Sequence, residues 1–200
     1  MNYDAILFDF DGVLMDSEPV HYACWSEALR PLGFHLDWET YARTTIGISE
    51  AATMALFAKL SKPPLDLAEI QARYPLKKEL FRGRMAGELP FAPGVKELVA
   101  WLDGQYRMAV VTSSARAEIE PLLVNGGIRE RFQAVVCAED VARHKPAPDA
   151  YLLAARLVGA QAPLVVEDSD SGMESARAAG FDAIRIPAAA RTVELVRAAL

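Results

Sequence analysis

The hydrophobic positions follow two different rhythms along the chain. In the stretch from residue 18 to residue 84, apolar residues recur at spacings of three and four, which is typical of amphipathic helices. No strand pattern interrupts this stretch, and glycine or proline separates its segments. We therefore predict consecutive helices at 18–32, 38–45, 50–60 and 67–84.

On either side of this stretch, short apolar runs alternate with helical segments. The runs predict strands at 5–8, 108–111, 134–137, 163–166 and 183–186, and helices at 95–105, 115–124, 147–159, 171–180 and 191–200. Strands that alternate with helices form right-handed βαβ units, which build a parallel sheet covered on both faces. We predict an α/β core from residues 1–14 and 94–200. An all-helical domain at 15–93 is inserted through connections at 14–18 and 88–93.

Two aspartates end the first predicted strand. Asp9 and Asp11 are two residues apart, so their side chains point the same way if the chain stays extended, and Gly12 allows a turn directly afterwards. Two like charges in one small volume are costly unless a cation joins them or one carboxyl keeps its proton. Alternatively, one aspartate caps the next helix and the other lies in a turn, which is the commonest use of Asp after a strand.

Polar residues also follow the other predicted strands. Because the carboxyl ends of parallel strands meet at one edge of a sheet, we expect these residues to converge there. They are Thr112, Ser113, Ser114, Lys145, Glu167 and Asp168. Taken singly, the hydroxyl cluster could be a helix cap and the lysine a solvated loop residue.

Taken together, these side chains suit phosphoryl transfer. Oxygen ligands favour Mg²⁺ over zinc or copper, and the metal with an ammonium group would neutralise the charge of a phosphate. Hydroxyls and backbone amides at a helix start would hold the phosphate oxygens. One carboxylate could attack phosphorus while another moves protons.

Composition and charge exclude several other classes of function. The formal net charge of -6 argues against an extended nucleic-acid or anionic-membrane surface, because either needs a concentrated basic face. No apolar run is long enough to span a bilayer, and no leader pattern precedes the first strand. Cys24 and Cys137 lack metal-site spacing and are expected to be buried thiols. We expect a cytoplasmic monomer.

Four segments of the chain, in order, resemble the motifs of the haloacid dehalogenase superfamily of phosphohydrolases. The first is Asp9-Phe10-Asp11-Gly12-Val13, the second Thr112-Ser113, the third Lys145-Pro146 and the fourth Glu167-Asp168-Ser169 with Gly172. A single motif would be weak evidence, whereas four in order on the expected elements are specific. The resemblance implies a Rossmann-like parallel-sheet core with an inserted all-helical cap, as in the subgroup of β-phosphoglucomutase and phosphoglycolate phosphatase.

The resemblance also implies a role for each motif residue. Asp9 would form an aspartyl phosphate, and Asp11 would protonate the leaving group and later deprotonate water. Lys145 would neutralise charge beside Asp9, while Thr112 and the Ser113 amide would hold the phosphate oxygens. The Mg²⁺ ligands would be the Asp9 and Asp168 carboxylates and the Asp11 carbonyl, with Glu167 acting through a coordinated water. Superfamily dehalogenases and phosphonatases lack an aspartate at the position of Asp11.

The predicted cap carries the candidate specificity residues. His21 and Trp25 share one helix face, and the resemblance places His21, Gly47 and, approximately, Lys77 in the substrate site. Glu50 stands where the mutases of the family hold a second phosphate with arginine, and Arg43 is a possible displaced clamp.

We expect hydrolysis of a small phosphorylated metabolite, a sugar or polyol phosphate. The alternative enzyme is a phosphomutase. A catalytically silent phospho-ligand binding module is a third, different class of function.

Overall fold

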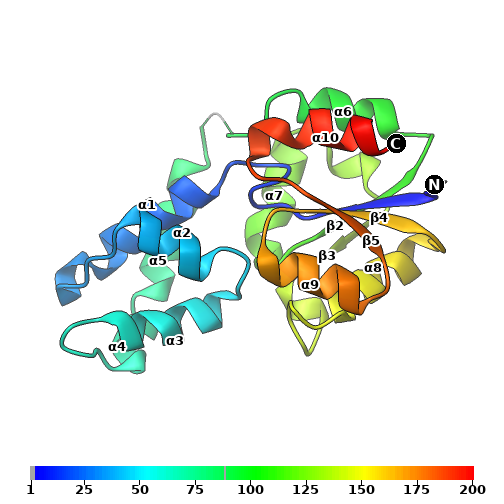
Figure 1. Cartoon of the computed structure of the whole chain (residues 1–200). Coiled ribbons are helices and arrows are strands. Elements are labelled where there is room, and N and C mark those ends of the chain that lie inside the picture. Colours follow the sequence, from blue (N-terminus) through cyan, green and yellow to red (C-terminus); the bar gives the residue numbers. More distant parts are fainter. Residues whose placement is uncertain (1–2, 88) are drawn as a thin grey trace.

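A computed structural model describes residues 3–87 and 89–200, and a five-stranded parallel sheet is its centre. The strand order is β3-β2-β1-β4-β5 (Figure 1). The strands are β1 Ala5–Phe8, β2 Arg107–Val111, β3 Ala134–Val136, β4 Pro163–Glu167 and β5 Asp182–Arg185. The predicted α/β fold with a parallel sheet is therefore confirmed.

The register of the central strand determines where the polar residues meet. Phe8 of β1 lies opposite Val110 of β2 and Val166 of β4, and both pairings are parallel. The chain therefore leaves all three strands at the same edge of the sheet. Asp9 follows directly after β1, Thr112 after β2, and Glu167 is the last residue of β4.

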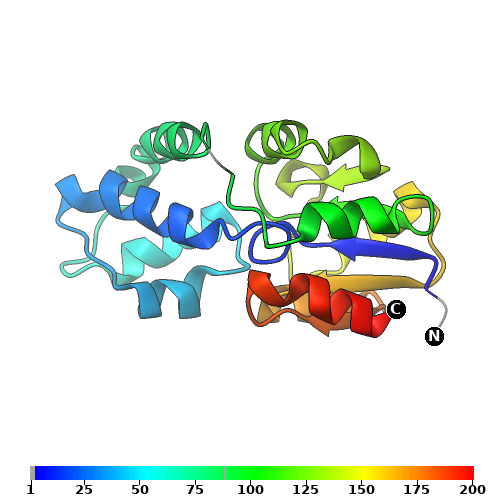
Figure 2. The same cartoon turned by 90° about the horizontal axis from the view of Figure 1, so that it is seen from above.

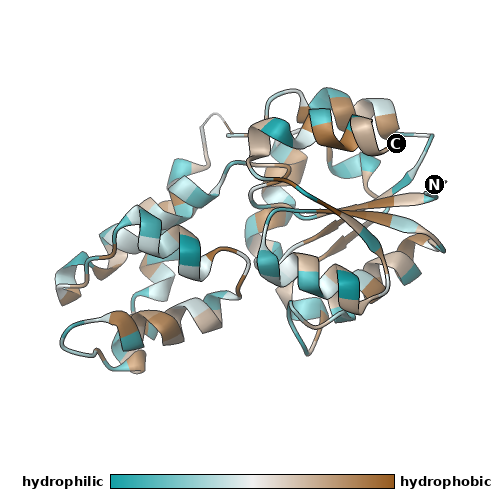
Figure 3. Ribbon diagram, in the orientation of Figure 1, coloured by the Kyte–Doolittle hydropathy of each residue, from teal (hydrophilic) through white to brown (hydrophobic). Residues whose placement is uncertain are grey.

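Helices cover both faces of the sheet, as Figure 2 shows from above. Because side chains alternate along a strand, Ile6 and Phe8 enter one hydrophobic cluster and Ala5 and Leu7 the other. The first cluster includes α6 Val95–Leu102, α7 Arg116–Asn125 and α10 Thr192–Ala199. The second includes α8 Asp149–Val158 and α9 Asp170–Ala178. The inner strands β1 and β4 are accordingly mainly apolar, whereas the edge strand β5 begins with Asp182 and ends with Arg185 (Figure 3).

Five helices form a separate lobe beyond the carboxyl edge of the sheet (Figure 1). They are α1 Glu18–Leu29, α2 Trp38–Thr45, α3 Glu50–Leu60, α4 Leu67–Gln71 and α5 Tyr74–Arg84. The lobe has its own hydrophobic cluster, in which Trp25, Phe57 and Ile70 are buried. The lobe is also joined to the core, because Cys24 of α1 and Phe81 of α5 pack in the first cluster of the sheet.

The two chain crossings between lobe and sheet lie side by side. The backbone N–H of Asp16 donates to the carbonyl of Pro90 at 2.8 Å, and that of Ala92 donates to Leu14 at 2.9 Å. Of the predicted boundaries, Met1 and Asn2 at the chain start and Glu88 in the second connection lie outside the described residues.

Some predicted helix bounds were wrong. The stretch predicted as one helix over 67–84 is two helices, because Pro75 has no N–H for the preceding turn and its ring clashes with the carbonyl there. The helix predicted over 95–105 ends at Leu102, since Gly104 has a φ of 79° and turns the chain. Short 3-10 helices complete the fold at η1 Arg30–Leu32, η2 Arg129–Arg131, η3 Ala138–Asp140 and η4 Ala189–Arg191. No helix among the described residues is long and apolar enough to cross a bilayer.

Candidate active site

A buried ion pair forms the floor of the site. Lys145 Nζ lies 2.6 Å from Asp9 Oδ1 and also donates to the carbonyl of Val111 at 3.0 Å. Both side chains are buried, the aspartate at 7% exposure and the lysine at 7%. Burial lowers the pKa of Lys145, but Asp9 and Glu167 more than offset this and raise it above its usual range. The lysine is therefore a permanent cation beside Asp9.

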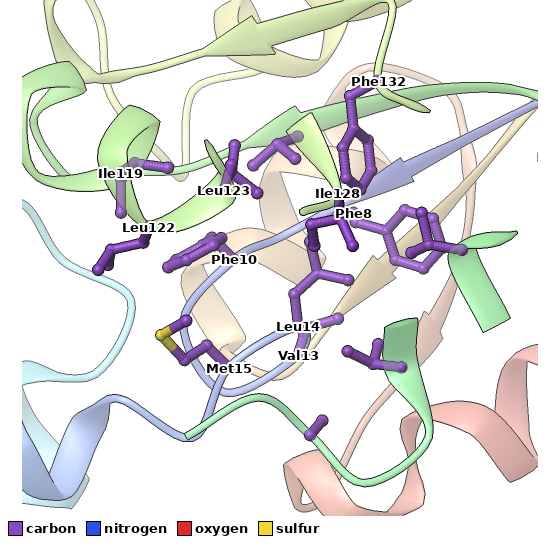
Figure 4. Packing of buried hydrophobic residues seen from close by; sticks show 14 of the residues in the cluster. Phe8, Phe10, Val13, Leu14, Met15, Ile119, Leu122, Leu123, Ile128 and Phe132 are labelled. Carbon is purple, nitrogen blue, oxygen red and sulfur yellow. The ribbon is translucent and has the colours of Figure 1, made fainter. Parts of the chain in front are cut away.

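The loop that carries the two aspartates is anchored by the residue between them. Phe10 is completely buried and packs in the hydrophobic cluster with Phe8, Ile119 and Leu123 (Figure 4). This packing fixes the backbone on both sides of Phe10. The directions of Asp9 and Asp11 therefore follow from the core.

Glu167 is the most fully bonded carboxylate of the site. Its Oε1 accepts from Lys145 Nζ at 2.6 Å and from the Tyr151 hydroxyl at 2.9 Å. Its Oε2 accepts from the backbone N–H groups of Asp168 and Ser169 and from the Ser169 hydroxyl, at 2.9, 3.0 and 3.0 Å. Burial raises its pKa, but Lys145 and these hydrogen bonds outweigh burial and lower it. Glu167 is therefore an ionised anchor for Lys145.

Three acidic side chains approach one another closely enough to hold a metal ion. Among residues 3–87 and 89–200, Asp9, Glu167 and Asp168 each offer a carboxylate oxygen, and these atoms lie within 4.8 Å of one another. Burial, followed by the charge of Glu167, raises the pKa of Asp168 to about 8. Burial and the neighbouring acids also raise the pKa of Asp9, although Lys145 opposes them. A divalent cation would remove this repulsion, so the residues present fit a magnesium site.

A glycine keeps space for Asp168. Gly12 has a φ of 75°, and a Cβ at this position would overlap the carboxylate of Asp168. Both the backbone conformation and the close approach therefore require glycine. The turn predicted from Gly12 is present, and it also makes room for the carboxylate of Asp168.

Asp11 is held by hydroxyl groups and by a histidine of the lobe. Its Oδ1 accepts a hydrogen bond from the Ser17 hydroxyl, and its Oδ2 accepts from the Ser114 hydroxyl at 3.0 Å. His21 Nε2 lies 3.5 Å from Oδ1, and the His21 ring stacks on Phe81. Burial raises the pKa of Asp11, but His21 and the two serines outweigh it and lower the pKa to about 2. In this arrangement Asp11 is an ionised base.

The helical lobe covers the site on the side away from the sheet. A cavity of about 60 Å³ lies between the lobe and the sheet edge. Of the predicted residues it is lined by Asp9, Asp11, His21, Gly47, Thr112, Ser113, Lys145 and Asp168, and Trp25 and Glu50 line it as well. Gly47 has a φ of 81°, and a Cβ there would overlap the Ser169 side chain, so the lobe contacts the core closely at this point.

Lys77 does not line this cavity. It is 0% exposed, and its Nζ pairs with Glu50 and lies 3.7 Å from Oε2 of Glu118 on α7. Trp25 and Phe81 surround the ammonium group. Lys77 therefore lies behind the cavity wall, where it joins the lobe to the core.

Several residues of the site were missed by the sequence reasoning. Ser17 directly precedes α1, where a serine usually caps the helix, but its side chain makes no cap hydrogen bond and its hydroxyl donates to Asp11 instead. Glu18 lines the cavity beside it, and burial raises its pKa to about 7. Tyr151 and Glu118 lie on helices, and nothing in the local sequence indicates their partners.

Comparison with known proteins shows which sequences and structures the chain resembles. Residues 6–186 match the model of the haloacid dehalogenase-like hydrolase family. The chain is 35% identical to fructose-1-phosphate phosphatase YqaB of Escherichia coli K12, over 92% of this chain and 96% of the relative. It is 32% identical to a phosphoglycolate phosphatase of Nitrosococcus oceani, over 90% and 82% of the two chains.

A solved structure resembles the fold over both lobes. CbbY of Rhodobacter sphaeroides, solved with xylulose 1,5-bisphosphate, is 31% identical and superposes with a TM-score of 0.79. The similarity covers 92% of this chain and 86% of that one. The chain therefore belongs to the haloacid dehalogenase-like hydrolases.

Proposed function

We propose that the protein is a Mg²⁺-dependent phosphatase that hydrolyses a small phosphorylated metabolite through an aspartyl-phosphate intermediate. The observation that carries this proposal is the convergence of Asp9, Lys145 and Asp168 on one cavity at the carboxyl edge of the sheet. A buried nucleophile, a fixed cation and a second carboxylate are the parts that phosphoryl transfer requires.

The metal would be held by the carboxylates of Asp9 and Asp168 and by the carbonyl of Asp11. When bound, Mg²⁺ supplies charge neutralisation to the phosphoryl group and lowers the pKa of the carboxylates around it. The five hydrogen bonds that Glu167 accepts favour an anchoring role for this residue over coordination.

The protein's own residues then divide the reaction into two steps. Asp9 attacks phosphorus, and the bond between phosphorus and the ester oxygen breaks. Lys145 stays next to Asp9 and neutralises the charge of the transferred group. Thr112 and the Ser113 amide hold the phosphoryl oxygens.

Asp11 moves the proton in both steps. The dianion of the bound phosphate raises the pKa of Asp11, so that it binds a proton and gives it to the leaving alkoxide. As the ionised form it then takes a proton from the water that cleaves the aspartyl phosphate. Its hydrogen bonds to Ser17 and Ser114 hold it in position between the steps.

The helical lobe, residues 15–93, acts as a cap on a core formed by residues 1–14 and 94–200. Closing it excludes bulk water while Asp9 attacks, and opening it releases the alcohol. The phosphatases YqaB and phosphoglycolate phosphatase support a sugar or polyol phosphate, or a similar small ester, as substrate. Glu50 in the cavity wall disfavours a phosphomutase, which must bind a second phosphate as firmly as the first.

The test is release of inorganic phosphate from a panel of metabolite phosphate esters, with Mg²⁺ and with EDTA. We expect steady release with Mg²⁺, and a loss of at least about a thousandfold in Asp9→Asn. Asp103→Asn, on the exposed end of α6, is the matched control and keeps full activity. Isomerisation without free phosphate, primed by a bisphosphate, would identify a mutase. No turnover of any ester would leave a binding module.

A further inference from the structure

The two ends of the active-site cavity differ in whether a lysine or arginine of the described residues lines them. The core end contains Lys145 with the carboxylates of Asp9 and Asp168. The lobe end, where the leaving alcohol of the ester would lie, is lined by Glu18 and Glu50 together with His21, Trp25, Tyr41 and Thr53. No lysine or arginine of the described chain lines this cavity apart from Lys145.

An ion pair with the buried Lys77 holds Glu50 in the wall of the cavity. Glu50 is the first residue of α3, and its side chain is 20% exposed, so it remains accessible to a molecule in the cavity. Its Oε1 pairs with Lys77, which fixes the direction of the carboxylate.

The charge of Lys77 is already balanced. Glu118, whose carboxylate oxygens accept no hydrogen bond from any described residue, lies 3.7 Å from the same ammonium group. Lys77 is also completely buried. It therefore presents no positive charge to the cavity, and the net charge of this group of three side chains is not positive.

Glu18 adds a second acceptor at the same end. Its Oε2 accepts a hydrogen bond from the Tyr41 hydroxyl at 3.2 Å, and Glu18 lines the cavity next to Asp11 and His21. Carboxylate oxygens of this kind accept hydrogen bonds from hydroxyl groups.

We propose that Glu50 is the specificity-determining residue of the cap and that it selects esters whose alcohol carries hydroxyl groups and no second anionic group. This inference rests on the proposed phosphatase function and narrows its substrates to monophosphates of neutral polyols and sugars. The proposed substrate class differs from the ligand of CbbY, which was solved with a bisphosphate. A second phosphate or a carboxylate on the alcohol would meet the carboxylate of Glu50, and no lysine or arginine of the described residues lines this end of the cavity to balance the added charge.

Arg43, outside the active-site cavity, is a possible ligand for a second phosphate. Arg43 does not line the active-site cavity but a neighbouring one of about 620 Å³, which shares Glu18 and Asp168 with it. Arg185 lines that cavity too, but it is paired with Asp170. If a second phosphate reached past Glu18, Arg43 would be the residue to bind it.

The experiment compares kcat/KM for fructose 1-phosphate and fructose 1,6-bisphosphate, with Mg²⁺ at fixed ionic strength. We expect the wild-type protein to prefer the monophosphate at least 100-fold. Glu50→Gln keeps the shape and removes the charge, so the preference falls about tenfold, through faster turnover of the bisphosphate. Glu39→Gln removes one exposed carboxylate from α2, and the preference stays as in the wild type.

The outcomes separate this inference from the proposed function. Equal turnover of both esters by the wild-type protein overturns the inference while the phosphatase stands. An unchanged preference in folded Glu50→Gln also overturns it, as does a loss of bisphosphate turnover in Arg43→Ala. No phosphate release from any ester overturns both. If Glu50→Gln does not fold, the wild-type ratio and Arg43→Ala still decide between the two results.

Discussion

Replacing Glu167 by glutamine distinguishes an anchor for Lys145 from a metal ligand. The substitution keeps the shape of the side chain but replaces one carboxylate oxygen by an NH₂ group. Both oxygens of Glu167 face donors only: Lys145 and Tyr151 on one side, Ser169 and two backbone N–H groups on the other. Either orientation of the amide therefore places donors against donors.

The expected loss of stability follows from three contributions. Breaking a buried ion pair costs about 3–5 kcal/mol, and a buried donor without an acceptor costs about 1–3 kcal/mol. At pH 9 Asp168, with its pKa of about 8, is ionised, and its carboxylate lies within 4.8 Å of Glu167. Removing the charge of Glu167 then relieves repulsion and returns about 3 kcal/mol at an effective dielectric constant near 20. The net destabilisation is about 3 kcal/mol.

The assay is urea unfolding at pH 9 in EDTA, so that Asp168 is ionised and no divalent cation contributes to the free energy of unfolding. With a slope of about 2 kcal/mol per molar urea, the midpoint of Glu167→Gln should fall by about 1.5 M. Glu174→Gln, exposed on α9, is the matched control and should change stability by less than about 0.5 kcal/mol.

The reasoning is refuted if Glu167→Gln is as stable as the wild-type protein in EDTA, or more stable. That result is expected if Glu167 is held only by a metal ion, because losing its charge would then relieve repulsion without breaking an ion pair. A weaker effect of Mg²⁺ on stability would accompany it.

Three further results are expected. Gly12→Ala forces a positive φ on a residue with a Cβ and pushes that atom into Asp168, so the Kd for Mg²⁺ rises at least about tenfold by calorimetry; an unchanged Kd would contradict the site. Cys24 and Cys137 are buried, and burial raises the pKa of both thiols, that of Cys137 to about 12; a chromogenic disulfide at pH 8 should react with neither until the protein is unfolded. Phe57→Ala removes a ring from the centre of the lobe's hydrophobic cluster and should cost about 3–5 kcal/mol in urea unfolding, and a loss below 1 kcal/mol would show that the lobe adapts.

The core of the site could be predicted because it depends on sheet topology. Asp9, Thr112 and Asp168 each follow an apolar run, and parallel strands bring such positions to one edge whatever the details of packing. Lys145 was placed with them through its motif. The structure confirms that these side chains face one cavity.

The positions of the other site residues depend on contacts between helices and strands that are far apart in the sequence. Local sequence patterns do not encode these contacts. The spacing of Lys77 on its helix indicates a face but not that Glu50 and Glu118 pack against that face. Ser17 stands at a helix start, where a serine usually caps the backbone, yet a tertiary partner, Asp11, binds its hydroxyl instead. At this position the tertiary hydrogen bond to Asp11 replaces the local hydrogen bond that would cap the helix.

The side-by-side crossings have a consequence for how such a chain can change over evolution. Leu14 and Asp16 of the outgoing crossing are joined to Ala92 and Pro90 of the returning one by backbone hydrogen bonds. Because the insertion begins and ends at nearly the same point, a tight turn could replace all five helices without disrupting the pairing of the strands in the sheet. The helical lobe is thus an exchangeable module, and new substrates can be acquired by rebuilding it while the phosphoryl-transfer chemistry below stays the same.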